Sequence, residues 1–192
     1  DLNKLIQDSF IAYKHLSIVR EQRGKLKFLN EDFFVFFQYQ QLFMLNIQLA
    51  KIFEAKKAQK RNIRALFQEI ISGHFSDEII PFLADNKNNG VTYELFIQKI
   101  KELNSSIKPY QNIIDKVSNA RNKIYAHSDI DRMINFPTIE ELKLLIDLAS
   151  NLYNNSRGQL YSTHTDFTRG INNLTINYVI KVIQQWTEKS GT

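Results

Sequence analysis

The chain has 192 residues, an apolar fraction of 43% and a net charge of +5, so it is long enough to bury a sizeable core. It contains no cysteine, which excludes disulfides, thiolate zinc sites and cysteine nucleophiles and fits a reducing cytoplasm. Its few glycines and prolines, 6 and 3, favour long helices over a sandwich or barrel. We therefore expect one cytoplasmic domain over residues 1–192.

The first third of the chain is predicted to be helical almost throughout. Apolar residues recur near a period of 3.6 over residues 2–23, and Gly24 breaks the pattern. A second helix is predicted to begin near Asp32, after acids that suit a helix start, and to reach about Ala58. A third is predicted over about residues 61–72, with a glycine directly after it as a stop.

Residues 33–50 carry no charge and resemble a membrane span in length. Five amide side chains interrupt this run, and burying them in lipid would be costly. The run is better explained as a central bundle helix or a subunit interface, and we expect no membrane association.

The middle of the chain alternates short helices with loops. Residues 76–84 form a short segment, and residues 85–90 have the composition of a loop. Thr92 is a predicted N-cap for a helix that reaches about Leu103. A further helix is predicted after Pro109.

The C-terminal part is predicted to contain two more helices. Thr138 and Glu141 have the spacing of a capping box, for a helix that continues to about residue 155. The last helix is expected over about residues 172–188. Residues 171–181 could form a strand instead. The sequence thus predicts an all-α bundle of six to seven helices.

Residues 121–129, Arg-Asn-Lys-Ile-Tyr-Ala-His-Ser-Asp, bring together a permanent cation, a carboxamide, an imidazole and a carboxylate. Five residues separate Arg121 from His127, which puts the two side chains about 120° apart on a regular helix. They do not converge within one uninterrupted helix. We therefore expect the helix to end near residues 126–127, or the site to be completed across a two-fold axis.

The spacing of Arg and His alone has little weight. Arg157 and His164 repeat it with six residues between them, in polar, glycine-containing surroundings that predict a loop after a helix. A basic stripe at Lys56, Lys60 and Arg64 would form on a helix and could contact a phosphate backbone. A solvated helix face is the preferred explanation of that stripe.

The full context of the motif resembles the signature of the HEPN superfamily, in which an Arg and a His four to six residues apart form a metal-independent ribonuclease site. Asn122 after the Arg, Ala126 before the His and Asp129 two residues beyond it are most similar to the AbiU-type branch of abortive-infection proteins. The resemblance implies a HEPN-like helical bundle and a toxin or phage-defence role. It also implies an RNA substrate and a homodimer in which two motifs face one cleft, with an antitoxin protein as a possible partner.

The chemistry implied is RNA phosphodiester transesterification. His127 would take the proton of a ribose 2′-OH or protonate the leaving 5′-oxygen, and Arg121 would hold the phosphate. Asn122 would donate to a phosphate oxygen or orient His127. The candidate substrate-binding residues are Lys123, Tyr125 and Asp129, of which Asp129 could also orient the imidazole.

Three further points limit this interpretation. Related toxins often carry, two residues after the His, a Tyr that a partner modifies; Asp129 stands there, so such modification is not expected. Neither a metal-ligand spacing such as HExxH nor a glycine-rich nucleotide loop occurs, so we expect no metal and no cofactor. The alternatives are a non-catalytic HEPN-like module that binds RNA or protein, and a motif that only caps a helix.

Overall fold

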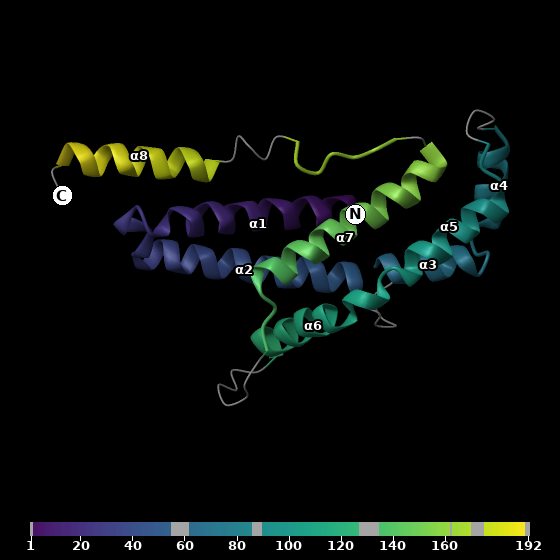
Figure 1. The fold of residues 1–192 in the computed structure, drawn as a ribbon, viewed down its shortest axis with the longest axis horizontal. Coiled ribbons are helices and arrows are strands. Elements are labelled where there is room, and N and C mark those ends of the chain that lie inside the picture. The colour runs from purple at the N-terminus through teal and green to yellow at the C-terminus, as the bar shows by residue number, and fades with distance from the viewer. Residues whose placement is uncertain are drawn as a thin grey trace.

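A long antiparallel helix pair forms the centre of the molecule (Figure 1). The computed structural model describes residues 2–54, 62–85, 90–126, 135–161, 163–169 and 175–190. The central pair consists of α1 (Leu2–Arg23) and α2 (Asp32–Phe53), joined by the 3₁₀ turn η1 (Lys27–Asn30). The predicted bounds of the first helix are confirmed, and its buried side chains include Ile6, Phe10, Leu16 and Val19.

Two helices pack against this pair, and the first of them contains Arg121 and Asn122 of the motif. α6 (Gln111–Ala126), preceded by the 3₁₀ turn η2 (Lys108–Tyr110), packs against α2. α7 (Ile139–Tyr161) crosses α1 and also contacts α2 and α6. Arg121 and Asn122 therefore lie in the layer next to the central pair.

The remaining helices lie at the two ends of the molecule. α3 (Ile63–Ile71), α4 (Ser76–Asp85) and α5 (Tyr93–Ser105) gather at one end, and α8 (Thr175–Ser190) lies beside α1 at the other (Figure 1). No strand occurs in the ranges that the structure describes, so the all-α prediction is confirmed and the strand alternative fails from Thr175 onward.

The core has two parts. The larger cluster joins α1, α2, α3, α5, α6 and α7 through side chains such as Leu49, Phe67 and Leu145, all fully buried. The smaller one joins the ends of α1, η1, α2 and α8 through residues that include Val19, Leu29 and Ile180. Burial of this apolar surface is the main stabilising contribution to the bundle.

The capping contacts that were predicted at several helix ends are present in the structure. The Thr138–Glu141 capping box is formed in both directions, because Thr138 N donates to Glu141 Oε2 at 2.8 Å and Glu141 N donates to Thr138 Oγ1 at 3.2 Å. Thr92 Oγ1 accepts from Leu95 N at 3.3 Å at the start of α5. Gly73 follows α3 with φ of 81°, which a residue with a side chain rarely adopts.

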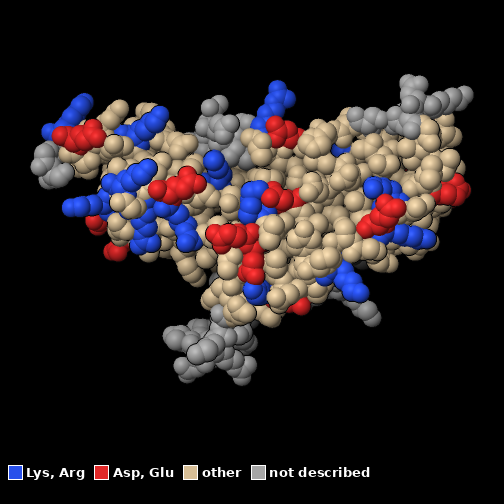
Figure 2. Space-filling model, in the orientation of Figure 1, with Lys and Arg blue, Asp and Glu red and all other residues tan. Residues whose placement is uncertain are grey.

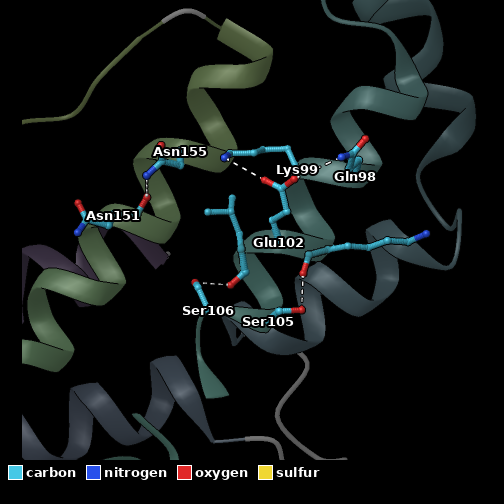
Figure 3. A network of polar contacts seen from close by, with 9 residues as sticks. Gln98, Lys99, Glu102, Ser105, Ser106, Asn151 and Asn155 are labelled. Carbon is cyan, nitrogen blue, oxygen red and sulfur yellow. Dashed lines mark hydrogen bonds and ion pairs between the residues drawn. The ribbon is translucent and has the colours of Figure 1, made fainter. Parts of the chain in front are cut away.

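The exposed side of α5 is lined with polar contacts between neighbouring turns (Figure 3). Lys99 Nζ lies 3.2 Å from Glu102 Oε2, an i, i+3 pair on the surface. At the end of the helix, Ser105 and Ser106 donate to the carbonyl oxygens of Lys101 and Leu103 at 2.9 and 2.7 Å. Of these two carbonyl groups, that of Leu103 is among the last four of the helix, which have no partner within it.

Two predicted helix ends are wrong. α2 ends at Phe53 rather than near Ala58, because Glu54 adopts an extended backbone (φ −74°, ψ 120°). α7 continues to Tyr161 rather than stopping near residue 155. There the Asn154 side chain exchanges two hydrogen bonds with the Thr165 backbone, of 2.8 and 3.0 Å, so tertiary contacts hold a polar stretch in the helix.

The uncharged run over residues 33–50 lies within α2, which confirms the prediction of a bundle helix. None of the helices in the described ranges has the length and apolar character that crossing a membrane requires. Leu45 and Leu49 are buried on one face of α2, while Phe33 and Phe36 on the same helix are 64% and 62% exposed.

Candidate functional site

Arg121 lies in the C-terminal part of α6, where apolar residues anchor the helix. Ile114, Val117 and Ala120 are at most 3% exposed and follow one another at i, i+3 and i+6. They turn one face of α6 into the core. Arg121 comes directly after this face, so that its side chain is only 16% exposed.

Glu54, the residue that directly follows α2, holds the guanidinium of Arg121. Nη2 of Arg121 donates to Glu54 Oε1 at 2.9 Å, and Nη1 donates to Oε2. This is a bidentate pair, the strongest geometry for an arginine and a carboxylate. Because the Glu54 side chain is only 9% exposed, loss of either partner would leave a poorly hydrated charge.

Asn122 joins the same cluster through its side-chain oxygen. Nη2 of Arg121 donates to Asn122 Oδ1 at 2.7 Å. The contact uses the carbonyl of the amide, and leaves its N–H groups as the donors that a phosphate would need. The structure thus brings together two of the three predicted catalytic residues, whose roles remain predictions.

The other motif residues are described in part or not at all. Lys123 and Tyr125 belong to α6, but their side chains lie outside the described residues. His127 and Asp129 lie outside them altogether. The described part of α6 ends at Ala126, and both the predicted helix break and the approach of His127 to Arg121 remain predictions.

Glu54 is the site residue that the sequence analysis did not find. The second helix was expected to extend past it, which would have placed Glu54 in a helix interior. The sequence contained one signal: the acid Glu54 directly follows two apolar residues, Ile52 and Phe53. Both are buried in the structure, so Glu54 lies next to an apolar region. A carboxylate in such a position requires a cation or several hydrogen bonds.

The predicted basic stripe is not a continuous helix face. Lys56 and Lys60 lie outside the described residues, and α2 has already ended before them. Arg64 lies in α3, where Nη2 donates to Gln111 Oε1 at 2.7 Å. Burial lowers the pKa of Arg64, partly offset by the nearby Asp115. Arg64 therefore links α3 to α6 instead of forming a solvated stripe.

The second Arg–His pair has a different environment from the first. Arg157 lies within α7, not in a loop, because the helix continues through it. Its Nη1 donates to Thr165 Oγ1 at 3.2 Å, and its guanidinium lies over the rings of Tyr153 and Tyr161. His164 is exposed. These contacts fasten the segment after α7 to the helix, which is a structural role.

The described histidines and acids do not gather into a metal-binding group. Over the described ranges no cluster of three or more His, Cys, Asp or Glu side chains could hold a metal ion. His15 is half-buried between α1 and α2, with Nδ1 3.3 Å from Gln41 Oε1. Burial lowers the pKa of His15, and the contact with Gln41 offsets this only in part.

An all-α bundle with an Arg-Asn pair on the penultimate turn of a core helix has the features of a HEPN domain. A family model described as AbiU2, a HEPN family, matches residues 2–179. The chain therefore belongs to the AbiU2 family of HEPN proteins, and this membership indicates an abortive-infection HEPN domain. Neither the curated proteins nor the solved structures gave a significant match.

Proposed function

We propose that this protein is a metal-independent endoribonuclease of a bacterial toxin or anti-phage abortive-infection system. The observation that supports it most directly is the anchored guanidinium of Arg121, held by Glu54 and Asn122 in a chain of the AbiU2 family. An arginine fixed before substrate binds is suited to stabilise charge on phosphorus, because no reorganisation is needed during the reaction.

The guanidinium keeps donors for a substrate. An arginine has five N–H groups, and contacts with other described residues use three of those of Arg121. The two that remain can bind a phosphate oxygen. Glu54 would then act as a positioning residue, because it contacts Arg121 and not the reacting atoms.

The reaction is a transesterification within the RNA strand. The ribose 2′-oxygen bonds to phosphorus, the bond from phosphorus to the 5′-oxygen breaks, and the products carry a 2′,3′-cyclic phosphate and a 5′-hydroxyl. His127 would accept the 2′-OH proton as imidazole or donate a proton to the 5′-oxygen as imidazolium. The nearby C-terminal end of α6 would favour its protonated form.

The remaining motif residues are proposed to bind the strand. Tyr125 would stack on a base, Lys123 would contact a phosphate, and Asp129 would orient the His127 ring. A homodimer with two-fold symmetry would place two copies of the motif across one cleft. An antitoxin protein that restrains the enzyme is a further proposed partner.

A second candidate function is a non-catalytic HEPN-like module that binds RNA or a partner protein. The observation that favours it is also the Glu54–Arg121 pair, since the carboxylate neutralises the cation that would otherwise attract a phosphate. In that case the motif would hold the end of α2 against α6.

Incubation of the purified protein with labelled RNA in EDTA separates the two functions. The enzyme would yield products ending in a 2′,3′-cyclic phosphate, and Arg121→Ala and His127→Ala would abolish them. Arg157→Ala and His164→Ala are matched controls, because they remove the same residue types from the second Arg–His pair and should leave cleavage unchanged. Intact RNA with measurable binding would favour the module.

A further inference from the structure

A second feature, distant in sequence from the motif, is a positively charged pocket at the turn between α1 and α2. Its volume is about 790 Å³, and Arg20, Arg23 and Lys27 line it. No acid belongs to the described residues that line it. Figure 2 shows many Lys and Arg side chains over this end of the molecule, with Asp and Glu side chains among them.

One of the pocket cations, Arg23, is held in place by an uncharged partner. Arg23 Nε donates to Asn30 Oδ1 at 2.6 Å, and Asn30 Nδ2 donates to the Lys27 carbonyl oxygen at 3.3 Å. Within the described part of the chain, none of the three pocket cations forms a direct ion pair with an acid. Arg20 interacts electrostatically with Glu140 at the start of α7, so the charges of Arg23 and Lys27 are the least offset and the most available to an anion.

Exposed aromatic rings run along α2 and lead into the pocket. Phe33, Phe36 and Tyr39 are 64%, 62% and 52% exposed, and their spacing of three residues places them along one side of the helix. Tyr39 itself lines the pocket. Cations beside exposed aromatic rings are the combination by which proteins bind a single nucleic-acid strand, through its phosphates and its bases.

The pocket reaches α7, which is paired with α6, the helix that contains Arg121 and Asn122. Ile139, the first residue of α7, lines it, and Glu141, two residues further along, pairs with Lys116 of α6. Lys116 precedes Arg121 by five residues, which is about 7.5 Å along a helix. A strand that leaves the pocket along the start of α7 would therefore reach the motif region.

We propose that this pocket binds the phosphates of a single RNA strand, with Tyr39 stacked on a base, and so extends the RNA-binding surface beyond the motif. The identity of the ligand as substrate RNA rests on the proposed function, but binding itself needs no cleavage. A second copy of the chain is a poor occupant, because symmetric contact through this face would bring the same three cations together.

Binding is tested with a labelled 2′-O-methyl oligouridine strand, which lacks the attacking 2′-OH and cannot be cleaved by the proposed chemistry. The triple variant Arg20→Gln, Arg23→Gln, Lys27→Gln is expected to bind at least about tenfold more weakly than the wild type in fluorescence anisotropy. The slope of log affinity against log salt should fall by about 2, since each phosphate contact on a single strand contributes about 0.7. Tyr39→Leu should weaken binding about fivefold or more.

The matched control removes the same charge elsewhere, by Lys4→Gln, Lys99→Gln and Lys101→Gln at the start of α1 and on α5. It should keep the wild-type affinity and salt slope. Equal weakening in both triple variants, unchanged binding in the pocket variant, or no binding by the wild type would overturn the proposal. So would a pocket variant that changes the oligomeric state while its RNA affinity stays the same.

Cleavage of unmodified RNA is measured separately, so the two proposals can fail independently. A wild-type protein that binds the 2′-O-methyl strand through the pocket but leaves unmodified RNA intact would overturn the ribonuclease proposal alone. A protein that cleaves RNA, and whose pocket variant binds the modified strand with wild-type affinity, would overturn the pocket alone.

Discussion

Glu54 and Arg121, which are 67 residues apart in sequence, form a bidentate ion pair that joins the end of α2 to α6. The pair lies at the point where the chain leaves the helical path after Phe53, and it gives the motif arginine a defined position before any substrate binds. The position of Arg121 therefore depends on Glu54, a residue far outside the motif.

The first prediction concerns the stability of this pair. Glu54→Gln, Arg121→Gln and the double variant should form a double-mutant cycle with a coupling free energy of about 1–3 kcal/mol, because both side chains are largely buried. Urea denaturation of the four proteins measures it. A coupling below about 0.3 kcal/mol would mean that the two residues act independently.

The second prediction concerns the geometry of the Arg121 side chain. Arg121→Lys keeps the charge but cannot form two parallel hydrogen bonds with Glu54. If the motif is catalytic, we expect the turnover number for RNA cleavage to fall on the order of 10²-fold while RNA affinity changes little. The control is Arg157→Lys, which should cleave at the wild-type rate. Wild-type turnover in Arg121→Lys would show that only a positive charge is needed.

The third prediction concerns stability in acid. The pKa of Glu141 is lowered by its hydrogen bond with Lys116, and further by the Thr138 backbone. A carboxyl whose pKa is lower in the folded state stabilises the protein above its unfolded pKa, and this contribution disappears as the pH falls through the folded value. Between about pH 5 and pH 3, Glu141→Gln should therefore lose less unfolding free energy than the wild type.

Urea denaturation of the wild type and Glu141→Gln across this pH range provides the measurement. Glu102→Gln is a suitable control, since Glu102 also pairs with a lysine but lies on the exposed side of α5. The interpretation fails if the wild type and Glu141→Gln lose the same free energy over this range.

The fourth prediction concerns His15. Burial lowers the pKa of its imidazole, so the folded state binds its proton at a lower pH than the unfolded chain does. Stability is then lost as the pH falls through the ordinary histidine range, because the unfolded state takes up the proton first. A proton NMR titration should give a midpoint for His15 below the ordinary value of a histidine side chain. A midpoint at or above that value would contradict the prediction.

The helices could be predicted from the sequence because their signals are local. The apolar period of residues 2–23 and the Thr138–Glu141 capping box each depend on residues within a few turns of one another, and both are observed. The two helix ends that were predicted wrongly depend on contacts between residues that are far apart in the sequence. Glu54 and Asn154 each bond to a residue in another element or segment, and such contacts override local propensity.

The sequence could predict only the part of the candidate site that lies in one continuous segment of the chain. Sequence spacing placed Arg121 beside Asn122, and their contact is observed. It could not identify Glu54, since no pattern within the chain links positions so far apart. The basic pocket was missed for the same reason, because Ile139 of α7 reaches the turn between α1 and α2 only in the folded bundle.

The length of α2 has a practical consequence for the choice of substrate. Tyr39 and Phe53, the residue directly before Glu54, are 14 residues apart along this helix, a separation of about 21 Å. A dinucleotide is too short to touch both places, so its cleavage would report on the motif alone. Only a longer strand could connect the pocket to the motif, and the KM of such a strand should therefore depend on its length.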